Sequence, residues 1–314
     1  MAHKPRTAKN FQGIHIPVIS CFQGIDGRGP IDSAAQKRVL RYVIEAQEAD
    51  GIIACATTGE AGSLSENEYQ ELARLILTET RALNPDIPVI LGTTHINPRV
   101  VIERHQFAAE LGFDGALVSH PPYMKPDQRG IYAFFKELAA AIPTVPIFIY
   151  NIWYRTGGKG IDANTLIELA QIPGIYGVKD NGVSLEHIDA VIAATDRSNF
   201  VYLSGDDLYL FDMLAHGGDG GILAAAHVVG REMKAMRAAI KQGALTEALH
   251  LHRLIKPVVA GLFMEPNPAP LKYMLNLLGL EVGAPRAPTI LTVTDAAMSA
   301  LATLLQSYQQ VASR

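Results

Sequence analysis

Lys179 is the side chain of this sequence best placed to act as a nucleophile. It directly follows the apolar run 174–178, so its ammonium group should lie at the end of a buried strand. Burial among apolar groups disfavours the charged form of a lysine and lowers its pKa. A neutral amine in a cleft can attack a ketone and form an imine. The alternative is a structural lysine paired with Asp180 or Glu60, because such ion pairs also perturb lysines.

Hydroxyl groups lie at the ends of two other apolar runs. Tyr150 ends the run 145–150, where its phenol could relay protons while an imine forms, unless the ring only packs there. Thr57 and Thr58 follow the run 52–56, where a strand turns into a helix. Hydroxyls and backbone N–H groups at such a turn suit a carboxylate, although threonines there also serve simply to cap the turn.

Arg155 supplies a cationic group shortly after the apolar run 145–150, which Tyr150 ends. Arg155 lies in the segment Asn151-Ile152-Trp153-Tyr154-Arg155. An arginine at the mouth of a site can hold a carboxylate through two parallel hydrogen bonds. The alternative is an ordinary solvated surface charge.

The sequence gives little support for a metal site, a phosphate-binding loop or a serine nucleophile. The ten histidines show no metal-ligand spacing, and His250 and His252 should point to different faces of a helix. Asp206 and Asp207 could hold a cation or open a helix. The glycine-rich segment 217–221 precedes a strand, which indicates a tight turn rather than a phosphate-binding loop. No serine lies in a nucleophile elbow.

The elements that must position these residues alternate along the chain. Eight apolar runs, counted from Ile14, are separated by amphipathic segments with helical spacing. The runs lie at 16–22, 52–56, 88–91, 115–118, 145–150, 174–178, 200–203 and 221–223. The helical segments lie at 38–49, 66–81, 98–111, 128–141, 162–171, 185–194 and 206–216.

This alternation predicts an α/β fold, a (β/α)8 TIM barrel with a C-terminal helical extension. Alternating strands and helices form parallel sheets, and strands buried on both faces are apolar throughout. In such a barrel the chemistry lies at the carboxyl ends of the strands, where the polar residues named above gather. A doubly wound sheet is the rival, but its glycine-rich phosphate loop is missing.

Three regions are predicted along the chain. They are a mobile N-terminal arm over 1–10, the catalytic barrel over 11–230 and the helical extension over 231–314. The extension should hold helices at 244–261, 269–278 and 295–308.

Composition limits the classes of function. The chain has 314 residues, 48% of them hydrophobic, and a formal net charge of −4, which disfavours nucleic acid as a partner. Cys21 and Cys55 lie in apolar runs and are interpreted as small buried hydrophobes. The polar N-terminus does not look like a signal peptide, and no run is long enough to span a membrane. These features predict a soluble protein of the cytoplasm with no membrane partner.

The motifs, taken together and in order, resemble the dihydrodipicolinate synthase / N-acetylneuraminate lyase family of class I, pyruvate-dependent aldolases. The resemblance covers nearly the whole chain. The matching segments are Thr57-Thr58-Gly59-Glu60, Tyr150-Asn151, Gly177-Val178-Lys179-Asp180, Ser204-Gly205-Asp206-Asp207, Gly217-Gly218-Asp219-Gly220 and Glu265-Pro266-Asn267-Pro268. The resemblance implies a barrel with a helical extension, assembled as a homotetramer that is a dimer of dimers.

The resemblance also implies the catalytic roles. Lys179 corresponds to the lysine that forms an imine with pyruvate, and no other cofactor or metal is implied. Tyr150 corresponds to the tyrosine that assists imine formation. Thr57 resembles the threonine that links two tyrosines in a proton relay, the second being Tyr123 from a neighbouring subunit.

Four further residues are implied to bind substrate. Thr58 resembles the threonine that holds the pyruvate carboxylate, and Arg155 the arginine that receives the carboxylate of the aldehyde. Gly205 and Ile222 fall where backbone groups line the family's pocket.

The resemblance is closest to the synthase branch, because the two adjacent threonines, Tyr123 and Arg155 are all present. It implies condensation of pyruvate with aspartate semialdehyde to 4-hydroxy-tetrahydrodipicolinate, a step of lysine and diaminopimelate biosynthesis. Several positions depart from the family pattern. Trp153-Tyr154 replaces proline and serine, Asp180-Asn181 replaces glutamate and alanine, and Pro17 and Cys21 alter the first strand.

Alternative functions remain open at this stage. Trp153 and Tyr154 favour an aromatic or unusual acceptor, so the same imine could serve aldol cleavage of a 2-keto-3-deoxy sugar acid, a hydratase-aldolase or a dehydratase. A non-catalytic barrel that senses a ligand is a second alternative, although a sensor does not need a proton relay. Ile96 and Pro122 stand where the family's lysine-inhibited synthases have asparagine and tyrosine, so no inhibition by lysine is expected.

Overall fold

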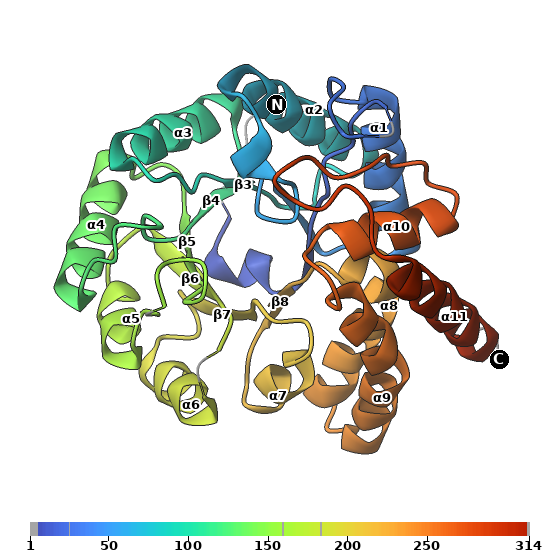
Figure 1. The fold of residues 1–314 in the computed structure, drawn as a ribbon. Coiled ribbons are helices and arrows are strands. Elements are labelled where there is room, and N and C mark those ends of the chain that lie inside the picture. The colour runs from blue at the N-terminus through green and yellow to red at the C-terminus, as the bar shows by residue number, and fades with distance from the viewer. Residues whose placement is uncertain (1–5, 25, 159, 183, 313–314) are drawn as a thin grey trace. The chain divides into compact units, whose positions relative to one another are not determined.

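The structure, a computed structural model, describes residues 6–24, 26–158, 160–182 and 184–312. Its strands form a closed barrel in the order β1 to β8 (Figure 1). The strands are β1 (Gly13–Pro17), β2 (Gly51–Ala54), β3 (Val89–Gly92), β4 (Gly115–Val118), β5 (Ile147–Asn151), β6 (Ile175–Asp180), β7 (Val201–Ser204) and β8 (Gly220–Ile222). The predicted barrel and its eight strands are confirmed, except that the first strand covers 13–17 rather than the predicted run 16–22.

Helices alternate with the strands along the chain, as the colours of Figure 1 show. The α-helices are α1 (Ser33–Arg41), α2 (Glu66–Leu83), α3 (Pro98–Leu111), α4 (Gln128–Ala141), α5 (Ala163–Leu169), α6 (Leu185–Ala194), α7 (Leu210–Ala215), α8 (Ala226–Lys241), α9 (Leu245–Leu262), α10 (Ala269–Leu277) and α11 (Asp295–Ala312). Three short helices are η1 (Ala8–Phe11), η2 (Tyr42–Ala46) and η3 (Ala61–Ser63).

The chain divides into two compact units. The first comprises Met1–Gly13 and Pro88–Ile222, and the second comprises Ile14–Ile87 and Leu223–Arg314. Each is interrupted in sequence by the other, so residues far apart along the chain meet within one unit.

The first unit contains β3 to β8 and the helices α3 to α7. Short polar side chains cap its helices at their N-termini: Asp127, Asp162 and Ser184 each accept a hydrogen bond from a backbone N–H of the first turn. The apolar faces of these helices pack on the strands in a buried cluster that includes Phe135, Val178 and other large side chains. This core supports the ends of β5 and β6, where the predicted nucleophile lies.

The second unit contains most of β1, β2, and the helices α1, α2 and α8 to α11. The Asp32 side chain caps α1 by accepting a hydrogen bond from the N–H of Ala35, and Ser65 forms a capping box with Glu68 at the start of α2. Helix α9 packs against α8 and α11. The side chains of Cys21 and Cys55 are both buried, which confirms their interpretation as small core residues.

The helix boundaries agree best where capping residues and apolar spacing coincide. Helices α3, α4 and α6 have the predicted bounds. Helix α7 begins at Leu210 rather than at Asp206, because the Asp206 carboxylate accepts a hydrogen bond from the N–H of Leu208 and holds a turn there. The segment predicted as a helix over 38–49 begins earlier and continues past Arg41 as one π-helical turn.

Parts of the predicted regions can be located. Residues 1–5 of the predicted N-terminal arm lie outside the described residues, while Arg6 forms an ion pair with Asp114 and residues 8–11 form η1. The predicted boundary at residue 230 falls inside α8 (Ala226–Lys241). Within the described part of the chain, no helix combines the length and the apolar character that crossing a membrane requires.

Candidate active site

Strand β6 carries Lys179 into the interior of the first unit. The apolar residues that precede it form the body of the strand, and Lys179 itself is only 5% exposed. Tyr150 lies directly beside it in the register of β5 and β6. The Lys179 Nζ lies 4.1 Å from the centroid of the Tyr150 ring. The two residues that the sequence predicts for imine chemistry are therefore neighbours.

The environment of Lys179 favours the neutral amine. Burial lowers the pKa of Lys179 to about 8, with Asp207 and Asp206 opposing that shift and Arg155 adding to it. No ion pair of Lys179 occurs among the described residues. With this pKa roughly a fifth of the lysine is neutral near pH 7.4, against about 0.1% for an ordinary lysine, and the neutral amine is the state that attacks a ketone.

Asp180, the first alternative partner of Lys179, is engaged elsewhere. It is fully buried, and its carboxylate accepts hydrogen bonds from the Tyr202 hydroxyl at 2.6 Å and from Asn151 Nδ2 at 3.1 Å. His187 Nε2 lies 2.9 Å from the same carboxylate. This cluster fixes the end of β6 without using the lysine amine.

The loop after β5 brings Arg155 towards the same region. Its turn is closed by hydrogen bonds from the backbone N–H groups of Arg155 and Thr156 to the Ile152 carbonyl, at 3.1 and 3.2 Å. Arg155 is exposed, yet its charge acts on the pKa of Lys179. A guanidinium in this place can meet an anionic group of a substrate that approaches the lysine.

Two aromatic rings precede the arginine in this loop. Trp153 and Tyr154 pack edge to face, with ring centroids 5.4 Å apart and an interplanar angle of 88°. The Arg155 guanidinium carbon lies 5.9 Å from the centroid of Tyr154. Burial raises the pKa of Tyr154 to about 12, so its hydroxyl stays protonated at neutral pH.

Gly205 follows β7 and approaches β6 closely. Its N–H donates to the Asp180 carbonyl at 2.6 Å. A Cβ at this position would lie 2.5 Å from Asn181 Oδ1, so only glycine fits. Ile222 ends β8 and is 1% exposed.

Asp206 and Asp207 are the acidic neighbours of the lysine. Burial raises the pKa of the Asp206 carboxyl, while backbone hydrogen bonds from Leu208 and Tyr209 and the charge of Lys179 oppose this. Within the described residues, no group of three histidine, cysteine or acidic side chains is arranged to hold a metal ion. Both carboxylates raise the pKa of Lys179, and Asp206 also holds the turn before α7 by accepting the N–H of Leu208.

The turn after β2, in the second unit, is held from several sides. Thr58 is 5% exposed, and its hydroxyl accepts a hydrogen bond from Asn267 Nδ2 at 3.1 Å. The Ser20 hydroxyl donates to the Gly59 carbonyl. Thr57 is half-buried, and its carbonyl accepts the backbone N–H of Glu60.

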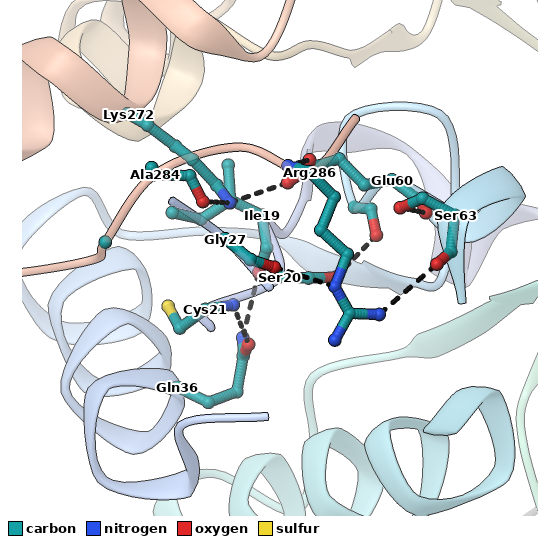
Figure 2. A network of polar contacts seen from close by, with 12 residues as sticks. Ile19, Ser20, Cys21, Gly27, Gln36, Glu60, Ser63, Lys272, Ala284 and Arg286 are labelled. Atoms are coloured by element: carbon teal, nitrogen blue, oxygen red, sulfur yellow. Dashed lines mark hydrogen bonds and ion pairs between the residues drawn. The ribbon is translucent and has the colours of Figure 1, made fainter. Parts of the chain in front are cut away.

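Glu60 completes this turn in the left-handed region, with φ of +53°. Figure 2 shows its carboxylate between Lys272 and the backbone of Arg286. Lys272 Nζ lies 2.6 Å from one carboxylate oxygen, and the N–H of Arg286 donates to the other at 2.6 Å. Glu60, the second alternative partner of Lys179, therefore forms its ion pair with Lys272 of its own unit. The side chains of Glu60 and Lys272 are both buried.

Arg286 ties the segment after α10 to the same region. Its guanidinium donates to the carbonyls of Gly27 and Ser63 at 3.0 and 3.2 Å (Figure 2). It also donates to the Glu68 carboxylate at 2.7 Å. It also lies over the Phe22 ring, 3.9 Å from the centroid. Residues of the C-terminal extension thus hold the turn that carries the two threonines.

The sequence reasoning missed these supporting residues. Asn267 lies in the motif Glu265-Pro266-Asn267-Pro268, but the sequence of this motif does not indicate that the Asn267 amide reaches Thr58. Lys272 could have been noticed from the sequence, because a lysine within an apolar helix indicates that an oppositely charged partner is buried beside it. The hydrogen bond between Asn181 and Tyr154, at 3.2 Å, could not be foreseen because it joins two different loops.

Tyr123, another predicted site residue, is also exposed in this single chain. Its side chain is 82% exposed, and its backbone has φ of +72°, an uncommon conformation for a tyrosine. Its contribution to a neighbouring subunit stays a prediction, as does the contact of Thr57 with the two tyrosines.

Comparisons with known proteins agree with this geometry. A relative from Listeria welshimeri, named 4-hydroxy-tetrahydrodipicolinate synthase, is 41% identical over 82% of this chain and 87% of its own. A relative of the same name from Thermosynechococcus vestitus is 37% identical over 89% of this chain and 92% of its own. A dihydrodipicolinate synthase from Cyanidioschyzon merolae, solved with lysine bound, has a TM-score of 0.90 and 31% identity over 96% of this chain and 99% of its own.

A second solved structure differs in its assembly. It is described as the first monomeric dihydrodipicolinate synthase variant and has a TM-score of 0.89 and 28% identity over 96% of this chain and 98% of its own. The sequence profile of the dihydrodipicolinate synthetase family matches residues 10–308. Since that match spans nearly the whole chain, this protein belongs to the dihydrodipicolinate synthetase family.

Proposed function

We propose that this chain is a 4-hydroxy-tetrahydrodipicolinate synthase, a lyase that condenses pyruvate with aspartate semialdehyde through an imine on Lys179. The observation that carries the proposal is the buried Lys179 amine, with a pKa lowered to about 8, beside the Tyr150 ring. The curated relatives named for this activity support it.

The proposed reaction begins with the neutral amine. Lys179 attacks the keto carbon of pyruvate, and loss of one water from the adduct gives the imine. Loss of a proton from the methyl group converts the imine into an enamine. The enamine carbon then attacks the aldehyde carbon, and the aldehyde oxygen takes up a proton. Finally the amino group of the new chain attacks the imine carbon, closes the ring and releases the lysine.

Protons must move at each of these steps. We assign this work to Tyr150, whose ring lies against the lysine amine. Thr57 and Tyr123 are assigned to the relay by resemblance. The exposure of Tyr123 in the single chain is consistent with a contact to a second subunit.

Substrate binding is assigned to four other residues. Thr58 is assigned to the pyruvate carboxylate, and Arg155 to the carboxylate of the aldehyde. Gly205 and Ile222 are assigned to the wall of the pocket, and the close packing of Gly205 on Asn181 supports a fixed backbone there. The covalent imine makes any further cofactor unnecessary in this proposal.

The cellular location and the oligomeric state of the enzyme are also proposed from the resemblance. We expect it to work in the cytoplasm as a homotetramer, a dimer of dimers, with small molecules as its only substrates. The division of the chain into a catalytic barrel over 11–230 and an extension over 231–314 belongs to the same proposal.

The test is pyruvate consumption by the purified protein with aspartate semialdehyde, followed by borohydride reduction to trap the pyruvate adduct. Turnover and trapping on Lys179 are expected, and Lys179→Ala should lose both. Trapping without turnover would keep the imine chemistry and overturn the acceptor. Turnover by Lys179→Ala, or no adduct on the native protein, would overturn the mechanism.

A second candidate acceptor is favoured by the exposed aromatic pair. Trp153 and Tyr154 are 41% and 53% exposed, and stacked rings of this kind could receive an aromatic aldehyde. In that case the protein would be a hydratase-aldolase acting on an aromatic pyruvate adduct. Faster turnover with an aromatic aldehyde than with aspartate semialdehyde would select this candidate.

A further inference from the structure

Asn181 holds the hydroxyl of Tyr154 in place within the first unit. Its Nδ2 donates to the Tyr154 Oη and to the Gly205 carbonyl, both at 3.2 Å. Asn181 is only 7% exposed, and its own N–H donates to the Asn151 carbonyl at 3.1 Å. The amide is therefore anchored at the end of β6, two residues after Lys179, and it fixes a side chain of the loop after β5.

The hydrogen bonds at Tyr154 leave its proton available. Asn181 reaches the phenol oxygen through an NH2 group. An amide NH2 is a donor only, so it cannot accept the phenol O–H. The Tyr154 oxygen is the acceptor in this contact, and its O–H can be donated to another group.

The position of this hydroxyl relates it to the substrate site. Tyr154 is half exposed, and its pKa responds to the charges of Tyr150, Arg155 and Asp206. Arg155 and Asp206 are also among the groups that act on Lys179. The phenol therefore lies on the open side of the site, next to the guanidinium assigned to the acceptor.

We propose that Tyr154, aimed by Asn181, is a specificity-determining residue that donates its O–H to the carboxylate of the acceptor aldehyde beside Arg155. This inference rests on the proposed imine site and narrows its acceptor to small aldehydes that carry a carboxylate. A carboxylate oxygen accepts both donors at once, whereas a neutral or aromatic aldehyde offers no such pair of acceptors. Asn181 is a positioning residue in this arrangement, because it acts through Tyr154.

The test measures binding without turnover. Trp153 is the only tryptophan of the chain and packs on Tyr154, so its fluorescence reports on this loop. Succinate, an unreactive dicarboxylate, is titrated into protein that holds saturating pyruvate. Loss of one hydrogen bond to a charged group should make Tyr154→Phe bind succinate about tenfold more weakly, with the KM for pyruvate unchanged.

Two further variants distinguish the positioning of the Tyr154 hydroxyl by Asn181 from an unspecific structural effect. Asn181→Ala should weaken succinate binding by roughly threefold, and it should have no further effect in the Tyr154→Phe background. Tyr209→Phe removes the same atom from another exposed tyrosine of the first unit and should change nothing. Butylammonium, which has no carboxylate, should not alter the fluorescence at the same concentrations.

The outcomes distinguish this inference from the proposed function. Unchanged succinate affinity in Tyr154→Phe would overturn the inference, as would effects of Asn181→Ala and Tyr154→Phe that simply add. Succinate binding that responds as expected, in a protein that fails to turn over aspartate semialdehyde, would keep the inference and overturn the proposed activity. Failure to trap pyruvate on Lys179 would overturn the proposed function and, with it, the imine site on which this inference rests.

Discussion

At the scale of single residues, the environment of Lys179 decides its chemistry. Burial is the largest cause of its lowered pKa, and three charged neighbours tune the result in opposite directions. Asp180, the adjacent carboxylate, is satisfied by Tyr202, Asn151 and His187 instead. The lysine is therefore held in place by its strand and kept free for reaction.

Imine formation should increase with pH through an apparent pKa of about 8. The reactive form is the neutral amine, so its fraction falls about tenfold for each pH unit below the pKa. Asp207→Asn should lower that pKa further, because the carboxylate raises it, and Arg155→Ala should raise it. The measurement is the rate of borohydride trapping of pyruvate between pH 6 and pH 10, in buffers of constant ionic strength. A midpoint at the ordinary lysine value, or equal shifts in both variants, would contradict this account.

Arg155→Ala should raise the KM for aspartate semialdehyde by roughly tenfold or more, because a hydrogen-bonded charge partner of the carboxylate is lost. The KM for pyruvate should change little. Steady-state kinetics with each substrate varied in turn gives both values. Arg129→Ala is the matched control, since Arg129 is an exposed arginine of the same unit that pairs with Asp127. If both variants behave alike, Arg155 is only a surface charge.

At the scale of elements, the C-terminal extension supports the turn after β2. Asn267 precedes α10, Lys272 lies within it, and Arg286 follows it, and all three bond to residues of the segment 58–68. The extension therefore does more than cover apolar surface in the second unit. It determines the conformation of the turn to which pyruvate binding is assigned.

Lys272→Met should destabilise the protein by about 3–5 kcal/mol, because it leaves the buried Glu60 carboxylate without its ion-pair partner. Urea unfolding followed by circular dichroism gives the free energy. Lys37→Met is the control: Lys37 pairs with Glu79 on the surface of the same unit, at the same distance of 2.6 Å, and its loss should cost about 1 kcal/mol or less. Equal losses in the two variants would show that burial of the Lys272 pair has no energetic consequence.

The strands and most helices were predictable because local patterns determine them. Apolar runs mark strands buried on both faces, and Pro98, Asp127 and Ser184 mark the starts of helices. Lys179 and Tyr150 were predictable as neighbours since adjacent parallel strands bring their ends together. The contacts of Asn181 and Arg286 were not predictable, because they join loops whose conformations depend on the complete fold.

At the scale of the whole molecule, the closed barrel and the match over residues 10–308 define the family, while regulation depends on a few positions. Relatives of the same fold include one solved with lysine bound and one described as a monomeric variant. Proteins that share this fold therefore include both a lysine-bound synthase and a monomeric one.

Lysine at millimolar concentrations should leave the activity unchanged. By the resemblance described above, Ile96, which is 46% exposed, and Pro122 stand where polar residues are expected in lysine-inhibited synthases. Initial rates with lysine from micromolar to 10 mM test this, with arginine as the control for ionic effects. Inhibition that becomes complete at or below millimolar lysine would show that other residues form the inhibitor site.

The long separation between Glu60 and its partners also has a consequence for synthesis of the protein. Arg286 lies 226 positions after Glu60, so at elongation speeds of about 5–20 residues per second the turn leaves the ribosome at least about 10 s before the groups that hold it. The nascent chain then contains Thr57 and Thr58 without the support of Asn267, Lys272 and Arg286. A ribosome-bound chain halted before residue 267 would therefore have the whole barrel sequence and yet lack the shaped turn, so activity should first appear close to the completion of translation.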